Sequence, residues 1–375
     1  MNKREIAEIR KQFTPERCAI TRIAGCYVDA DKNIRTLMKE AFYSIPEEET
    51  FKYFDIFKKT LSGKTGKNLL DLEFLLKSEQ AGGGQDFLLR LRDSKLSDDG
   101  LLEDFYTKVI ENFNYPENYY IILIHMAYDI PGKGSDEEEM FDASEDVYEC
   151  ILCSICPVKL SKPGLSYDTS QNAITERIRD WVVDPPVNGF LFPAFNDRAA
   201  DIHSMLYYSK KADDIQPELI EQLFGCQVPQ TQKDQKESFH TLVEDVLGED
   251  ADYEAVRGIQ ETLEEIVEEH ADSPDPVLLG CREVRKVFEM SGIPEEKLEG
   301  FEEMFDSTVG KGTEILLSNI AGESSVTVEV PDVTIRVNPE RLDLIETKVI
   351  EGRECIVIAA DSRVSLNGLE VRTCR

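Results

Sequence analysis

Residues 146–160 read DVYECILCSICPVKL, and this stretch decides the fold class of the chain. The run is almost continuously apolar, and a second run of the same kind, NYYIILIHMAYDI, occupies residues 118–130. Such runs are typical of strands that are covered on both faces of a sheet. We therefore predict that both are central strands of a mixed sheet in an α/β domain, with helices packed against the sheet.

Three cysteines of this stretch, Cys150, Cys153 and Cys156, lie three residues apart. An iron–sulfur run of this type needs a fourth cysteine, but Leu160 occupies its position, and a structural zinc site usually has a second Cys or His pair. Because side chains alternate along a strand, Cys150 and Cys156 face one side and Cys153 faces the other. We predict that the three thiols are small core side chains. A thiol or metal protein that uses them is an alternative hypothesis.

The rest of the N-terminal half switches between helical and extended patterns. The apolar spacing predicts helices at residues 1–13, 46–61, 86–95 and 100–113, a hairpin over 18–42, and strands at 68–76 and 189–195. Residues 196–210, NDRAADIHSMLYYSK, predict another helix, with Asn196 as its N-cap. We assign all of these elements to one α/β domain, residues 1–226.

The C-terminal half has a different pattern. A polar segment at 227–235 predicts a linker, and apolar residues with helical spacing predict a helical segment over 236–308. In the tail, residues 309–375, apolar and polar residues alternate as they do in strands, and the Asn-Gly pair at 367–368 indicates a hairpin turn. We expect a small antiparallel β tail that packs with the helical segment, so that the whole chain is α+β.

The chain is strongly acidic. It has 42 Lys and Arg against 74 Asp and Glu among 375 residues, a net charge of −32. Such a surface repels phosphate backbones and anionic lipids, so we expect no membrane partner and no broad nucleic-acid-binding face. Direct nucleic-acid binding through a small local basic patch stays an open alternative. The first residues lack the apolar segment of a secretory signal, and nine cysteines, an odd number, are typical of reduced thiols. We therefore expect a cytoplasmic protein.

Known catalytic motifs are missing from the sequence: there is no HExxH, GxSxG or GxGxxG, and the Walker-like phrase at 61–68 lacks its first glycine. The candidate catalytic residues are His125 and, at the start of the predicted helix, Asp197 and Arg198. An acidic residue there also stabilises a helix N-terminus, and we favour that interpretation. Acidic residues 136–139 could bind a divalent cation, but a solvated loop fits a simple run better. We expect no cofactor.

Four phrases resemble a known family. They are KTLSGKTGKNLLDLEF (59–74), ILCSICPVKLSKPGLSY (151–167), DWVVDPPVNGFLFPAFNDR (180–198) and VTIRVNPERLDLIETKVIEG (333–352). Together they closely resemble a bacterial family with a domain of unknown function, number four-three-one-seven. The resemblance covers nearly the whole chain and implies no activity.

The order of the expected elements also resembles that of the nucleoid-associated protein family. Both have two central strands, a strand-and-helix unit, further helices, a helical hairpin and a small β tail. This similarity implies a cytoplasmic protein that associates with the nucleoid and its DNA-handling enzymes, and it supplies no catalytic residues.

Our leading hypothesis is a non-enzymatic protein that acts through macromolecular contacts, at the nucleoid if the second resemblance holds. The acidic charge favours protein partners, with basic DNA-handling proteins as candidates. The first alternative hypothesis is an enzyme of unknown reaction type with a polar pocket near Asp197 and Arg198. The second is the thiol or metal protein described above.

Overall fold

The computed structural model describes residues 1–133, 139–140, 146–248, 253–321, 326–338, 341, 344–360, 364–366 and 369–371. The chain divides into two compact units: residues 1–233 with 274–276, and residues 234–273 with 277–375. The domain limits expected from the sequence stay predictions. No helix in the described ranges combines the length and the apolar character needed to cross a bilayer.

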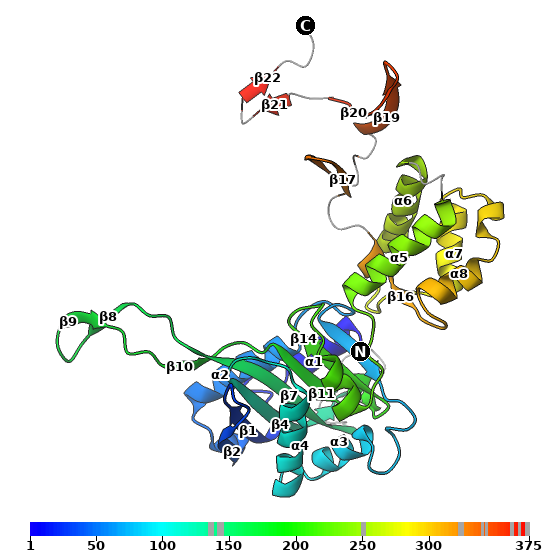
Figure 1. Cartoon of the computed structure of the whole chain (residues 1–375). Coiled ribbons are helices and arrows are strands. Elements are labelled where there is room, and N and C mark those ends of the chain that lie inside the picture. Colours follow the sequence, from blue (N-terminus) through cyan, green and yellow to red (C-terminus); the bar gives the residue numbers. More distant parts are fainter. Residues whose placement is uncertain are drawn as a thin grey trace. The chain divides into compact units, whose positions relative to one another are not determined.

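Unit 1 is built on an eight-stranded sheet (Figure 1). Its strands are β1 (Ile20–Val28), β2 (Ile34–Ala41), β3 (Leu69–Glu73), β4 (Tyr119–Ile130), β7 (Asp146–Leu160), β10 (Trp181–Val183), β11 (Asn188–Phe192) and β14 (Ser204–Ser209). Seven of them follow the order β2-β1-β4-β7-β11-β14-β3, and β10 pairs with β7 beside this path. The two apolar runs of the sequence are β4 and β7, which lie side by side near the middle of the sheet, as predicted.

Helices cover both faces of this sheet. On one face, the first core includes side chains of α3 (Gly84–Asp93), α4 (Asp99–Asn112) and the π-helix η3 (Leu219–Phe224). On the other face, the second core includes side chains of α1 (Lys3–Arg10) and α2 (Glu47–Thr60). Strands β4 and β7 contribute to both cores, which explains why their sequences are apolar at nearly every position.

Two of these helices, α1 and α4, begin at a residue whose side chain caps the helix N-terminus. The Asn2 side chain accepts hydrogen bonds from the backbone N–H groups of Arg4 and Glu5, and the Glu5 carboxylate accepts one from the Asn2 N–H, which makes a capping box. Asp98 caps α4 in a similar way, through the Leu101 N–H. Such caps satisfy donors that a helix N-terminus otherwise leaves unpaired.

Two expectations from the sequence are wrong. Every strand pairing described in the large sheet is antiparallel, so the sheet is not mixed. Residues 196–210 form no helix: β12 (Ala194–Asn196) and β13 (Ala199–Asp201) make a hairpin, and β14 follows. Strand β14 is buried along its whole length, and a continuous apolar run cannot be told from a buried helix by spacing alone.

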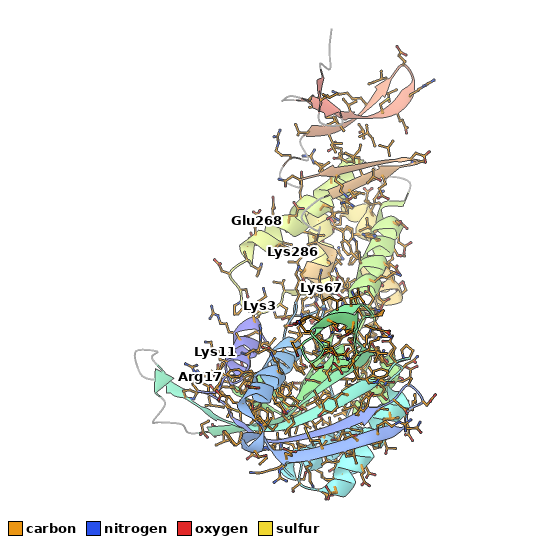
Figure 2. The ribbon with its side chains drawn as sticks, turned by 90° about the vertical axis from the view of Figure 1, so that its left-hand side faces the viewer. Lys3, Lys11, Arg17, Lys67, Glu268 and Lys286 are labelled. Atoms are coloured by element: carbon orange, nitrogen blue, oxygen red, sulfur yellow. The ribbon has the colours of Figure 1, made fainter. Side chains whose placement is uncertain are left out.

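Unit 2 has a helical core. Its elements are α5 (Gln232–Leu247), α6 (Tyr253–Glu269), β15 (Leu278–Leu279), α7 (Cys281–Met290), the 3₁₀ helix η5 (Glu295–Leu298), α8 (Phe301–Thr308), β16 (Ile315–Leu316) and α9 (Leu317–Ile320). Phe288 of α7 and Phe301 of α8 meet edge to face, with ring centroids 5.5 Å apart. Charged side chains such as Glu268 and Lys286 lie on the exposed faces of the helices (Figure 2).

The tail forms three antiparallel hairpins, as the alternating pattern predicts. They pair β17 (Val326–Val330) with β18 (Val333–Val337), β19 (Ile345–Ile350) with β20 (Arg353–Ile358), and β21 (Val364–Leu366) with β22 (Leu369–Val371). The Asn-Gly pair at 367–368 lies outside the described residues, and so do residues 136–138 of the acidic loop. That loop connects the short strands β5 (Gly132–Lys133) and β6 (Glu139–Met140).

Candidate functional site

Asp197 and Arg198 form the two-residue turn between β12 and β13. Their φ angles are 51° and 57°, the left-handed values that a tight hairpin turn requires. The Asp197 N–H donates to a Glu5 carboxylate oxygen at 2.7 Å. Arg198 Nη2 donates to the Pro131 carbonyl at 3.1 Å and lies 3.2 Å from Glu8 Oε1. These contacts join the turn to α1 and leave the Arg198 charge paired.

His125 lies on β4 and is completely buried. Its Nδ1 is 2.7 Å from Thr21 Oγ1, and its Nε2 is 3.8 Å from a Glu149 carboxylate oxygen. Burial lowers the pKa of His125, and the Glu149 carboxylate partly opposes this effect. Burial therefore favours the neutral form of the imidazole.

The sheet separates His125 from the other two candidates. His125 alternates with Ile124 along β4, and Ile124 belongs to the second core, so the imidazole projects on the face of the first core. Phe195, two residues before Asp197, belongs to the second core. The structure therefore brings Asp197 and Arg198 together but does not place His125 with them.

The three cysteines of β7 are buried on opposite faces of the sheet. Cys150 and Cys156 belong to the second core, and Cys153 belongs to the first. Burial raises the pKa of the Cys150 thiol to about 12 and raises the pKa of Cys153 and Cys156 as well. Among the described residues, no three Cys, His, Asp or Glu side chains are arranged to hold a metal ion.

A two-stranded extension of the sheet is the most prominent exposed feature of unit 1 (Figure 1). It consists of residues 158–183 and is called the ribbon below. At its base β7 pairs with β10, where Leu160 is opposite Trp181. At its far end β8 (Leu165–Asp168) pairs with β9 (Ala173–Glu176), where Leu165 is opposite Glu176.

The two paired ends share one continuous register. Four residues lie between them on each strand, and two hydrogen bonds bridge the interval: Ser161 N–H to Asp180 O at 2.8 Å, and Arg177 N–H to Gly164 O at 2.9 Å. The ribbon therefore extends over residues 158–168 and 173–183, roughly 35 Å at about 3.3 Å per residue. An unbroken register fixes which side chains share a face.

The outer part of the ribbon is amphipathic. Its apolar face carries Leu165, Tyr167, Ile174 and Ile178, which are 76%, 56%, 63% and 85% exposed. One charged side chain, Glu176, shares this face and lies opposite Leu165. By the same alternation, its opposite face carries Lys162, Arg177 and Arg179. Hydrophobic side chains that share one uncovered face are typical of interaction sites.

Sequence reasoning missed this feature, although a signal was present. Leu165 and Tyr167 alternate with polar residues, a polar turn follows, and Ile174 begins the return strand. The runs are only four residues long in each strand, and their flanks contain Pro163 and Gly164. Such short patterns do not distinguish a hairpin from a loop until the pairing at the base of the ribbon is known.

Comparison with known proteins places nearly the whole chain in one family. The model of the family described as Domain of unknown function (DUF4317) matches residues 1–369. No curated protein matches the chain. These results give no support to the resemblance to nucleoid-associated proteins. Because the match includes both compact units, the chain belongs to the family described as Domain of unknown function (DUF4317).

Proposed function

We propose that this protein acts as a non-enzymatic binding protein and that the apolar face of the ribbon contacts a partner protein. One observation carries the proposal: Leu165, Tyr167, Ile174 and Ile178 are exposed together on one face. Covering an apolar side chain of this size stabilises a complex by about 1.5–3 kcal/mol, before the cost of ordering the two partners.

The position of the ribbon supports this function. A two-stranded hairpin without a covering layer is at best marginally stable in water. Beyond Leu160 and Trp181 the ribbon pairs only with itself among the described residues, so neither face of its outer part gains the cover that β4 and β7 have. A partner that packs on the apolar face would supply that missing layer.

The charge of the chain favours one class of partner. With a net charge of −32, the protein attracts basic proteins and repels nucleic acids. The ribbon itself has four basic side chains, Lys159, Lys162, Arg177 and Arg179, and three acidic ones, Asp168, Glu176 and Asp180. We therefore propose a partner with an apolar contact surface surrounded by basic residues, and basic DNA-handling proteins are the candidates.

Two adjacent positions of β9 offer a matched test. Ile174 lies on the apolar face, and Thr175 lies on the opposite face of the same strand. Tagged wild-type protein, Ile174→Asp and Thr175→Asp would be cross-linked in the source bacterium and recovered with and without nuclease. Proteins recovered with the wild type and with Thr175→Asp should be reduced at least about tenfold with Ile174→Asp.

The same experiment also distinguishes the results that would contradict the proposal or indicate another kind of partner. Equal recovery with Ile174→Asp and the wild type would contradict the proposal. A partner that disappears after nuclease, and that depends on Arg177 and Arg179 instead, would point to nucleic acid on the opposite face. Light scattering of the purified variants would show whether the partner is a second copy of this chain.

A further inference from the structure

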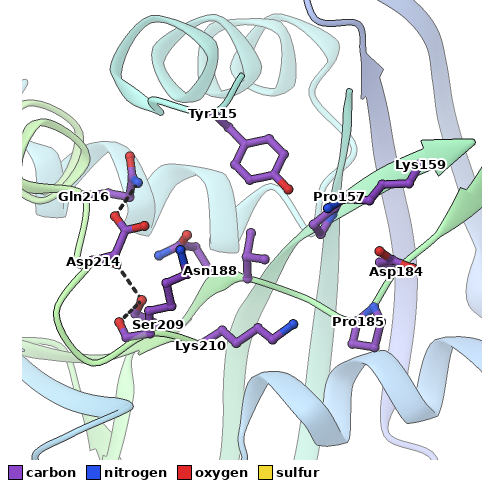
Figure 3. A pocket seen from close by; sticks show the side chains of 12 residues that line it. Tyr115, Pro157, Lys159, Asp184, Pro185, Asn188, Ser209, Lys210, Asp214 and Gln216 are labelled. Carbon is purple, nitrogen blue, oxygen red and sulfur yellow. Dashed lines mark hydrogen bonds between the residues drawn. The ribbon is translucent and has the colours of Figure 1, made fainter. Parts of the chain in front are cut away.

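A cleft lies at the base of the ribbon, where β7, β11 and β14 end (Figure 3). Its volume is about 230 Å³, below the roughly 300–1,000 Å³ of sites for drug-sized ligands. One wall comes from the residues that flank the ribbon, where the Asp184 N–H donates to the Pro157 carbonyl at 2.8 Å. The size of the cleft suits a ligand of a few non-hydrogen atoms.

The floor of the cleft carries a fixed acceptor, Asn188 Oδ1. Asn188 is only 4% exposed, and its Nδ2 donates to Tyr207 Oη at 2.8 Å. Tyr207 donates its single hydroxyl proton to the Ile215 carbonyl at 2.8 Å, so it can only accept from Asn188. The amide orientation is therefore determined, and Oδ1 has no donor among the described residues.

The charged side chains of the cleft fall into two groups. Lys159 forms an ion pair with Glu117 at 3.0 Å, and Asp214 already accepts a hydrogen bond from the neutral Gln216 amide at 3.0 Å. By contrast, Lys210, Lys211 and Asp184 make no ion pair within the described part of the chain.

Four polar groups that line the cleft have complementary chemistry. Figure 3 shows the Tyr115 hydroxyl and the Lys210 ammonium entering the opening from opposite sides of the view. Lys210 can donate hydrogen bonds to a carboxylate or a phosphate. The Tyr115 hydroxyl can do so by giving up its long hydrogen bond to Glu117 Oε2, which is 3.5 Å away. Asp184 and Asn188 Oδ1 can accept hydrogen bonds from an ammonium group. A simple anion would contact only the two donors, the Tyr115 hydroxyl and the Lys210 ammonium.

We propose that this cleft binds a small zwitterion of the α-amino acid class. The ligand carboxylate contacts Lys210 and the Tyr115 hydroxyl, and the ligand ammonium contacts Asn188 Oδ1 and Asp184. This site is independent of the docking function of the ribbon, because none of these four residues lies on the apolar face of the ribbon.

Calorimetric titration of the full chain tests the site. The probes are glycine, L-alanine, L-serine and L-proline, with acetate and inorganic phosphate as anions and methylammonium as a cation. At least one amino acid should bind saturably, and each single-charge probe should bind at least about tenfold more weakly.

Two lysine variants provide a matched pair. Lys210→Met removes the exposed cleft ammonium and should weaken amino-acid binding about tenfold or more. Lys162→Met removes the same charge from the ribbon and should leave the affinity unchanged. The proposal is overturned if phosphate or acetate binds as tightly as every amino acid, if no amino acid binds up to about 10 mM, or if Lys210→Met binds like the wild type.

Discussion

Tyr167 and Ile174 are directly opposite each other in the β8–β9 hairpin, and more than half of each side chain is exposed to solvent. An aromatic and a β-branched side chain at such positions stabilise a pair of strands by about 0.2–1 kcal/mol. The same two side chains thus hold the end of the ribbon together and form part of its uncovered apolar face. Packing within the ribbon and docking of a partner depend on one surface.

Replacing Tyr167 should therefore loosen the end of the ribbon without affecting the body of unit 1. In Tyr167→Ala, backbone amides of residues 165–176 should exchange with deuterium about two- to fivefold faster, as expected for a loss of about 0.5–1 kcal/mol. Amides of β4 and β7 should be unaffected. Ser166→Ala, on the opposite face, is the control. Equal exchange in both variants would show that the cross-strand pair contributes nothing.

The cysteines of β7 should be unreactive in the folded protein. Burial raises the pKa of Cys150 to about 12, and the thiolate is the reactive form of cysteine. With iodoacetamide at pH 8, Cys150, Cys153 and Cys156 should remain unlabelled until the chain is denatured. The partly exposed Cys355 should react in the native state and serves as the internal control. Native labelling of Cys153 by mass spectrometry would contradict the buried arrangement.

His125 should make unit 1 less stable in acid. Burial lowers its folded-state pKa below the usual value of about 6.5, while Lys95, Arg92 and Arg22 lower it further and Glu149 raises it. Below the ordinary pKa of about 6.5, the imidazole binds a proton in the unfolded chain but not in the folded chain. The free energy of unfolding therefore decreases as the pH falls. The urea midpoint, followed by circular dichroism, should fall less between pH 7.5 and 5.5 in His125→Asn than in the wild type.

His203 provides a control of opposite sign. Its hydrogen bond to Glu79, 2.7 Å long, raises the pKa of His203. The pair of His203 and Glu79 stabilises the fold fully at a pH below the pKa that His203 has in the unfolded chain. This stabilisation is lost as the pH rises through the pKa that His203 has in the folded chain. His203→Asn should therefore show a larger loss of stability on acidification than the wild type. If both histidine variants respond alike, the assignment of these two effects is wrong.

The buried hydrogen bond between Thr60 and Ser154 joins α2 to β7. The hydroxyl oxygens are 2.6 Å apart, and Thr60 also contacts the Ile56 carbonyl at 3.1 Å. Thr60→Val removes the hydroxyl that is hydrogen-bonded to the buried Ser154 hydroxyl, which should lower the free energy of unfolding by about 1–3 kcal/mol. Adding Ser154→Ala should recover part of this loss, as measured by urea denaturation.

Thr50 of α2 is the matched control for this change. Its hydroxyl also donates to a backbone carbonyl four residues earlier, that of Pro46 at 3.1 Å, but Thr50 is only half-buried. Thr50→Val should change the free energy of unfolding by no more than about 0.5 kcal/mol. Equal effects at positions 50 and 60 would indicate that helix propensity, and not the buried hydrogen bond, determines the result.

The candidate sites differ in how far the sequence could predict them. The alternation of Cys150, Cys153 and Cys156 between faces follows from the two-residue period of a strand, and the structure confirms it. The cleft could not be predicted in this way, because Tyr115, Asn188 and Lys210 come from segments that meet only in the folded sheet. Nothing in the spacing of these residues indicates that they are neighbours.

The sequence by itself determined that residues 118–130 and 146–160 are central strands, because long runs rich in β-branched and aromatic residues that are apolar at nearly every position are typical of strands covered on both faces. Only the tertiary structure decided that residues 204–209 are a strand: β14 pairs with β11 and β3, and those neighbours supply the hydrogen bonds that a helix would supply locally. The ribbon likewise depends on its continuous pairing, since register places Leu165, Tyr167 and Ile174 on one face. The alternation of side chains along a strand follows from its local backbone geometry. Which distant segments lie next to each other depends instead on long-range strand pairing and its register.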